Sequence, residues 1–192
     1  MKTVIVGCGR VGSVLADAFD RLGHEVIVVD LKTTAFDRLP SSFGGAAIRG
    51  DGTDEDTLRR AGAEGADIFM AMTEGDNRNV MSAQLATEAL DAKSVIAKIN
   101  DPLRASAYAE LGIATLCRTN LMASAVSDFL GLDLTFGPGL SAPTGQHPEH
   151  DAGGAAPGPA TGTEPTMPAG TSPNGPSDVP SAQAAPVTAR EG

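Results

Sequence analysis

Three glycines near the start of the chain have the spacing of a turn that binds phosphate. Gly7, Gly9 and Gly12 follow the apolar residues 4–6, and Asp30 ends a second apolar run. In such a turn the first glycine leaves a strand tightly, the second lets the backbone approach a pyrophosphate, and the third lets a helix pack on the sheet. The pattern predicts a cradle for a nucleotide. A glycine turn that serves packing alone is the alternative interpretation.

The residues around this turn also indicate which nucleotide it would bind. Asp30 lies at the distance along the chain at which a carboxylate accepts hydrogen bonds from a ribose 2′-OH and repels a 2′-phosphate. A helix that begins near Arg10 would direct its unpaired N–H groups and the positive end of its dipole at the phosphates. We therefore predict NAD(H) as the ligand, with ATP or ADP as the alternative, and we expect NADP to be disfavoured.

Two further loops carry polar residues where a strand is predicted to end. Asp51 and Gly52 follow a short strand at residues 46–48, and Thr73 follows a strand at residues 66–72. Ligands of open α/β sheets bind at the carboxyl ends of the strands. We therefore expect Asp51 and Gly52 to contact the adenine or its ribose, with a structural turn as the alternative, and we expect Thr73 to contact the nucleotide.

Lys98 lies near the end of the next predicted strand, at residues 94–99. A cation at this edge of a sheet contacts either a phosphate of the ligand or a carboxylate nearby. The sequence leaves both interpretations open.

A sheet of parallel strands alternating with helices would bring these residues together. Apolar runs predict six strands, at residues 4–6, 25–30, 46–48, 66–72, 94–99 and 113–117. Helical spacing and capping residues predict helices between them, including a short one at residues 34–39 that Pro40 stops. This alternation is typical of a Rossmann-type, doubly wound α/β fold, and we predict a parallel six-stranded sheet in the order 3-2-1-4-5-6.

Composition divides the chain into two parts. Eleven of the 13 prolines of the 192-residue chain lie from Pro138 onward, among glycine, alanine, serine and threonine. Such a segment buries too little apolar surface to offset its chain entropy. We predict a nucleotide-binding domain at residues 1–137 and a disordered tail at residues 138–192. Histidines and acids at residues 147–151 could ligate a metal, but in such a segment we interpret them as incidental.

Charge and hydropathy exclude several classes of protein. The net charge is −10 and the chain has no basic stripe, so nucleic acid is not expected as a partner. The longest apolar runs have five or six residues, against about 20 for a membrane-spanning helix. Cys8 and Cys117 are isolated thiols without metal-ligand spacing, which fits a reducing cytoplasm. We predict no transmembrane segment and no metal site.

Taken together, the separated motifs resemble the nucleotide-binding RCK (KTN) domain, of the TrkA N-terminal type, found in Trk and Ktr potassium uptake systems. The resemblance covers about residues 1–130. It rests on residues 7–12, on Asp30, on residues 50–53 followed by Leu58, Ala61 and Gly62, and on residues 73–77 and 98–102.

The resemblance implies a regulatory subunit and not an enzyme. Proteins of this kind form dimers and then a ring beneath a membrane potassium channel subunit, and the bound nucleotide changes the shape of the ring and the opening of the pore. This chain would then be cytoplasmic and would lie at the inner face of the plasma membrane through its channel partner. The mechanism would be differential binding to two ring states, because a ligand of equal affinity for both shifts neither.

The resemblance also implies a role for each site residue. Arg10 would reach a terminal phosphate. In order along the ligand, the phosphates would be held by Gly7, Cys8, Gly9, Arg10 and Val11, the ribose by Asp30, the adenosine side by Asp51 and Gly52, and the far end by Thr73, Glu74 and Lys98.

A small NAD-dependent oxidoreductase is the alternative function. The short-chain dehydrogenases need a tyrosine with a lysine four residues later, but the one tyrosine, Tyr108, has Gly112 at that position. His24 lies at the far end of the first predicted helix. The sequence therefore predicts no catalytic residues and favours a nucleotide sensor.

Overall fold

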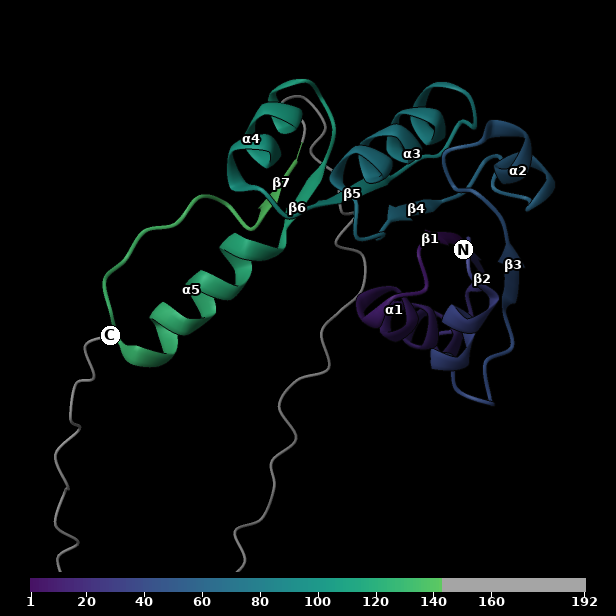
Figure 1. Cartoon of the computed structure of the whole chain (residues 1–192), viewed down its shortest axis with the longest axis horizontal. Coiled ribbons are helices and arrows are strands. Elements are labelled where there is room, and N and C mark those ends of the chain that lie inside the picture. The colour runs from purple at the N-terminus through teal and green to yellow at the C-terminus, as the bar shows by residue number, and fades with distance from the viewer. Residues whose placement is uncertain (143–192) are drawn as a thin grey trace, which may run out of the picture. The chain divides into compact units, whose positions relative to one another are not determined.

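The computed structural model describes residues 1–142, so the motif at residues 147–151 and nearly all of the predicted tail lie outside the described residues. A single sheet runs through the described part (Figure 1). Its strands are β1 (Lys2–Val6), β2 (Glu25–Asp30), β3 (Ala46–Arg49), β4 (Ile68–Ala71), β5 (Val95–Ile99), β6 (Thr115–Cys117) and β7 (Leu140–Ser141). The helices are α1 (Arg10–Arg21), the 3₁₀ helix η1 (Thr33–Arg38), α2 (Glu55–Arg60), α3 (Asp76–Glu88), α4 (Pro102–Glu110) and α5 (Arg118–Leu130).

The strand order is β3-β2-β1-β4-β5-β6-β7, and every neighbouring pair up to β6 is parallel. The predicted doubly wound order is therefore confirmed. The chain reverses its direction of winding between β1 and β4, which lie side by side although they are far apart in the sequence. At this switch point the connections leave the two strands in opposite directions, and a crevice opens at their carboxyl ends.

Alternating residues of β1 explain why the sheet is covered on both faces. Val4 and Val6 belong to the apolar cluster that contains Leu58 of α2 and Ala86 of α3. Ile5 belongs to the cluster on the other face, with residues of α1 and η1. Because successive side chains of a strand point to opposite faces, an uninterrupted apolar run requires cover on both.

Capping residues begin two of the helices as the sequence indicates. The Asp54 side chain accepts a hydrogen bond from Thr57 N at 2.9 Å and caps α2. Asp101 caps α4 in the same way, and Pro102 occupies the first turn, where its missing N–H has no partner to lose. The helix predicted before Pro40 is present as the 3₁₀ helix η1. No helix among residues 1–142 is long and apolar enough to cross a membrane.

The prediction of six strands was wrong by one strand. Leu140 and Ser141 form β7, which pairs antiparallel with β6 beyond the boundary that we predicted at residue 137. Backbone groups hold this segment, because Cys117 N donates to Gly139 O at 2.7 Å while the Leu140 side chain is 59% exposed. Apolar patterning does not detect a strand whose stability comes from its backbone.

We expect a chain ended after Gly137 to be less stable than one ended after Ala142. The shorter chain loses the β6–β7 pairing and the bond from Asn120 Nδ2 to Pro138 O. At about 1 kcal/mol for each net hydrogen bond, the free energy of unfolding should fall by about 2 kcal/mol. Urea denaturation of the two chains measures this difference, and coincident midpoints would show that β7 does not stabilise the sheet.

Candidate functional site

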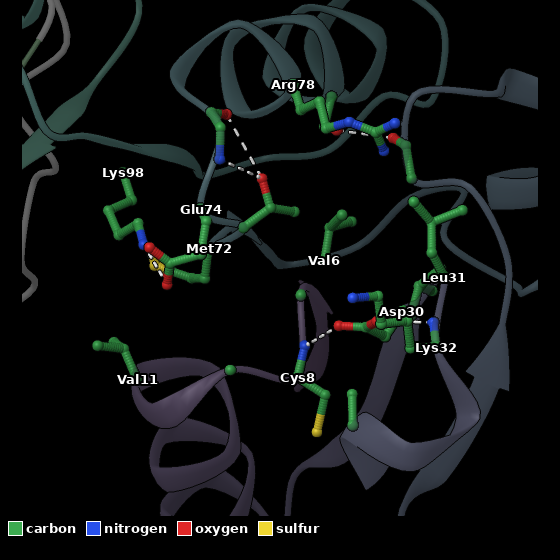
Figure 2. A pocket seen from close by; sticks show the side chains of 18 of the residues that line it. Val6, Cys8, Val11, Asp30, Leu31, Lys32, Met72, Glu74, Arg78 and Lys98 are labelled. Carbon is green, nitrogen blue, oxygen red and sulfur yellow. Dashed lines mark hydrogen bonds and ion pairs between the residues drawn. The ribbon is translucent and has the colours of Figure 1, made fainter.

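A cavity of about 1010 Å³ lies at the carboxyl ends of the five strands β1 to β5 (Figure 2). It brings together eleven of the twelve predicted site residues, from the ends of five strands and the segments that follow them; Gly12 is not among its lining residues. The predicted residues in the lining are Gly7, Cys8, Gly9, Arg10, Val11, Asp30, Asp51, Gly52, Thr73, Glu74 and Lys98.

Close packing accounts for the outer glycines of the turn. Gly7 has φ +102°, and a Cβ there would lie 2.9 Å from Thr73 N of the neighbouring loop. A Cβ on Gly12 would lie 2.0 Å from Gly7 O, so no other residue fits where α1 crosses the turn. These contacts place the first turn of α1 at the cavity.

Gly9 differs from its neighbours because the space beside it is open. A Cβ there would meet one atom within 4 Å, Glu74 Oε1, at 4.0 Å. Gly9 is the N-cap residue of α1, and neither a side-chain cap nor an acidic residue satisfies the first turn of this 12-residue helix. The backbone N–H groups of this first turn therefore have no capping side chain, and together with the helix dipole they suit an incoming phosphate.

Asp30 links the glycine turn to the end of β2. Its Oδ2 accepts a hydrogen bond from Cys8 N and its Oδ1 accepts one from Lys32 N, both at 2.8 Å. Each carboxylate oxygen keeps acceptor capacity, since an ionised carboxylate offers about four lone-pair positions. The side chain is thus held at the cavity edge and is still able to accept from a ligand hydroxyl.

The Asp51 side chain makes hydrogen bonds within its own loop. Asp51 Oδ1 accepts from Thr53 N at 3.0 Å and from Thr53 Oγ1 at 2.8 Å, and it lies 3.5 Å from Arg78 Nη1. Hydrogen bonds from the Thr53 backbone and side chain lower the pKa of Asp51, and the charge of Arg78 adds to this. Gly52 is tightly packed, because a Cβ would lie 2.1 Å from Val6 Cγ1.

Thr73 is held by the buried Asn79 of α3. Its N and Oγ1 both donate to Asn79 Oδ1, at 2.8 and 2.7 Å, and Asn79 Nδ2 donates in turn to Lys98 O at 2.7 Å. One amide therefore fixes the ends of β4 and β5 against each other.

Lys98 has a carboxylate as its partner in this structure. Its side chain is 2% exposed, and its Nζ lies 3.4 Å from Oε1 of Glu74, whose side chain is 81% exposed. Figure 2 shows the two side chains pointing toward each other at one end of the cavity, with Asp30 and Lys32 at the other. Of the two partners that the sequence allowed for Lys98, a ligand phosphate or a nearby carboxylate, the structure shows the carboxylate of Glu74.

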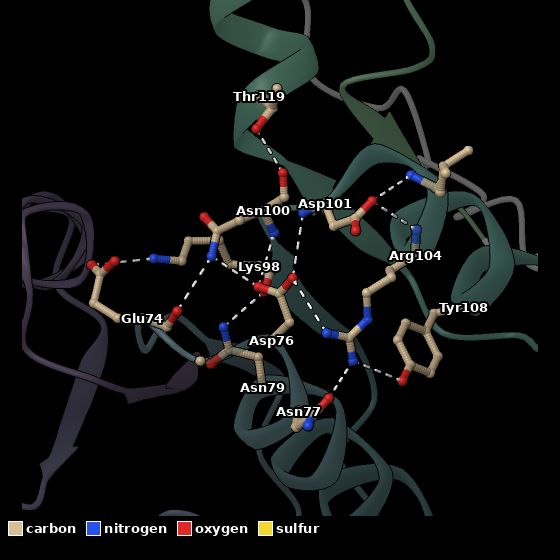
Figure 3. Close-up of polar contacts among 12 residues, drawn as sticks. Glu74, Asp76, Asn77, Asn79, Lys98, Asn100, Asp101, Arg104, Tyr108 and Thr119 are labelled. Atoms are coloured by element: carbon tan, nitrogen blue, oxygen red, sulfur yellow. Dashed lines mark hydrogen bonds and ion pairs between the residues drawn. The ribbon is translucent and has the colours of Figure 1, made fainter.

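A polar network orders the loops behind this pair (Figure 3). Asp76 Oδ1 accepts from Asn100 N at 3.0 Å and from Asn100 Nδ2 at 2.8 Å. Thr119 Oγ1 donates to Asn100 O at 2.6 Å, which fixes the first turn of α5 against the end of β5. Lys98 of β5 is opposite Leu116 of β6, and α5 begins two residues later, at Arg118. The start of α5 therefore lies at the same end of the cavity as Lys98.

Sequence reasoning missed four cations in the cavity wall, Lys32, Arg38, Arg78 and Arg118. With Arg10 and Lys98, the described wall holds six cations against three acids, in a chain of net charge −10. Each of these four residues lies in a loop or helix that follows a predicted strand. None of them belongs to a nucleotide-binding motif. This local excess of positive charge favours an anionic ligand.

The Cys8 thiol is the one cysteine side chain among the described residues that line this cavity. Burial raises its pKa, the Asp30 carboxylate raises it further, and Arg38 opposes both. A thiol with a raised pKa is a poor nucleophile near neutral pH, because the thiolate is the reactive form. Among residues 1–142, no group of three or more histidine, cysteine or acidic side chains is placed to hold a metal ion.

Comparison with known proteins identifies the chain's family. A family model described as the TrkA-N domain matches residues 3–119. The chain belongs to the TrkA-N domain family. The resemblance seen in the sequence is thereby confirmed.

One curated relative is the Trk system potassium uptake protein TrkA of Streptomyces coelicolor. It is 51% identical over 116 residues, which make up 60% of this chain and 52% of the relative. The chain spans about half the length of the first curated relatives that it matches. The names of these relatives therefore describe longer proteins, and this chain matches only one part of each.

Solved structures share the TrkA-N fold at low identity. The TrkA-N domain of the inner membrane protein ybaL from Escherichia coli is 20% identical with a TM-score of 0.60, over 67% of this chain and 96% of that one. The GsuK channel bound to NAD is 21% identical with a TM-score of 0.58, over 68% and 23%. GsuK bound to ADP is 22% identical with a TM-score of 0.57, over 67% and 33%. These likenesses establish the fold.

We expect Asp30→Asn to lower the pKa of the Cys8 thiol, because the substitution removes the negative charge that raises it. In a Cys117→Ser background, the pH midpoint of iodoacetamide alkylation should therefore move to lower pH in Asp30→Asn. Asp37→Asn, which changes an exposed carboxylate outside the cavity wall, is the matched control and should keep the original midpoint. Equal midpoints in all three proteins would refute the coupling between Asp30 and the thiol.

Proposed function

We propose that this protein is a regulatory subunit of a Trk-type potassium uptake system that binds NAD(H) or an adenine nucleotide. The observation that carries the proposal is the open phosphate cradle beside Gly9, in a chain of the TrkA-N family. Support comes from the relative named for Trk potassium uptake and from GsuK structures described as bound to NAD and to ADP.

The residues of the cavity fit such a ligand. The first turn of α1 offers N–H groups to a phosphate, and Asp30 offers acceptors to a ribose. The surplus of cations would offset the charge of a pyrophosphate. NAD(H) is the first candidate because Asp30 disfavours a 2′-phosphate, and ATP or ADP is the alternative.

We propose regulation and not catalysis because the described cavity wall contains neither a histidine nor the tyrosine–lysine pair of the short-chain dehydrogenases. Among its lining residues in the described part of the chain there is no histidine and no tyrosine. Its one thiol has a raised pKa. A small NAD-dependent oxidoreductase would require a proton donor beside the substrate, and a steady hydride transfer by the purified protein would favour that function instead.

The proposed partners are other copies of this chain and a membrane potassium channel subunit. On α5, Met122, Val126 and Phe129 are 63%, 58% and 88% exposed, and their spacing places them on one helical face. An apolar face left in water favours association, which supports a dimer or a larger ring. In this proposal the protein is cytoplasmic and reaches the inner face of the plasma membrane through the channel subunit.

The nucleotide would act by shifting the populations of two assembly states. A ligand that binds both states equally shifts neither, so the bound nucleotide must contact them differently. Asn100 Nδ2 donates to O of Glu74 in the cavity wall, and Thr119 Oγ1 donates to Asn100 O, so Asn100 joins the wall to α5, which carries the exposed apolar face. This connection is a physical route by which ligand contacts would reach an interface.

We expect Asp30→Ala to weaken NAD binding at least tenfold, because it removes two charged acceptors worth roughly 1.5–3 kcal/mol each. Isothermal titration with NAD, NADH, ADP and ATP measures the affinities. Asp37→Ala removes an exposed carboxylate outside the cavity wall and should bind as the unchanged protein does. Thermal unfolding of each variant separates lost binding from lost folding. If the unchanged protein binds none of the four nucleotides, the binding proposal fails.

The potassium role predicts a growth phenotype. Cells that lack the gene should need more potassium, and the unchanged protein should restore growth at limiting potassium. Asp30→Ala should not restore it, while Asp37→Ala should. Normal growth of the deletion strain at low potassium, with other uptake systems removed, would contradict this role and leave nucleotide binding to be judged by titration.

A further inference from the structure

Lys98 depends on a single, loosely held anion. Its ammonium group is almost completely buried, at the end of β5, and its one salt bridge among the described residues is to Glu74 at 3.4 Å. A buried ammonium group that loses its counter-ion is strongly destabilising. Lys98 therefore requires an anion at this point of the cavity, and Glu74 provides it in this structure.

The Glu74 carboxylate occupies a position where a ligand phosphate would otherwise fit. Its Oε1 is the atom that a Cβ on Gly9 would meet, at 4.0 Å, so it lies beside the open part of the glycine turn. The same oxygen faces Lys98. It therefore lies between the exposed N-terminus of α1 and the buried cation, which are the two positive groups at this end of the cavity (Figure 2).

The side chain of Glu74 can leave without disturbing the loop that carries it. Asn100 Nδ2 donates to Glu74 O at 3.3 Å, and Asn79 fixes the preceding Thr73 (Figure 3). These bonds hold the backbone, whereas the carboxylate has one long contact and is 81% exposed. The Glu74 carboxylate can therefore be replaced by another anion, whereas the buried Lys98 ammonium group stays in place.

We propose that Glu74 selects the class of nucleotide, favouring a dinucleotide over a nucleoside di- or triphosphate; this rests on the proposed nucleotide binding. A terminal phosphate at this end must displace the carboxylate from Lys98 or approach it against like-charge repulsion. The second ribose of a dinucleotide brings hydroxyl groups, which donate hydrogen bonds to a carboxylate. One acid therefore disfavours ADP and ATP and retains NAD(H).

The test compares the unchanged protein with Glu74→Gln and Glu88→Gln. Both substitutions remove one exposed negative charge, but Glu88 lies on α3 outside the cavity wall. Isothermal titration with NAD, ADP and ATP gives the dissociation constants of each protein. We expect Glu74→Gln to tighten ADP and ATP binding by about tenfold relative to NAD, which is a change of about 1.4 kcal/mol. Glu88→Gln should leave these ratios as they are in the unchanged protein.

Two results would overturn the proposal in distinguishable ways. If all three proteins bind nucleotides and Glu74→Gln leaves the ratio of ATP to NAD affinity unchanged, Glu74 does not select the ligand and the proposed function stands. If neither the unchanged protein nor Glu74→Gln binds any of the three, nucleotide binding itself fails, and the selectivity fails with it. Because Glu74→Gln removes the counter-ion of the buried Lys98 ammonium group, its unfolding temperature should fall, and thermal unfolding identifies the temperature at which the variant is still folded and the affinities are compared.

Discussion

The close contact between α1 and the glycine turn is the constraint on which the rest of the structure depends. Gly12 leaves room for Gly7 O, and Gly7 leaves room for the backbone of Thr73. A side chain at either position would push α1 away from the ends of β1 and β4. Both contacts are made with backbone atoms of neighbouring segments. They hold the first turn of α1 at the cavity without using its N–H groups, which are the donors that a phosphate needs.

Charge around that turn is the second determinant of what the cavity accepts. An acidic chain gathers six cations in the described wall and places three acids among them. Asp30 lies against the glycine turn, and Glu74 lies against Lys98 at the other end. In our account the cations attract a nucleotide of any kind, while the two carboxylates decide which ribose and which terminal group are tolerated.

Much of this arrangement follows from the sequence, and the exceptions have physical causes. The strand order, the short helix before Pro40 and the family follow from local patterns. The cations Arg38 and Arg118 escaped notice because helices and loops outside any motif carry them to the cavity. Strand β7 escaped notice because backbone hydrogen bonds, not apolar side chains, hold it to β6. The partner of Lys98 is a tertiary contact, and a strand-end position cannot choose between a carboxylate and a phosphate.

The central claim is that the cavity at the switch between β1 and β4 holds a nucleotide, with its phosphates at the start of α1. A crystal structure of the protein grown with NAD tests this most directly. The account predicts density for the dinucleotide in the cavity, with the pyrophosphate beside Gly9 and a ribose hydroxyl on Asp30. An empty cavity at saturating NAD, or a dinucleotide bound at another surface, would contradict it.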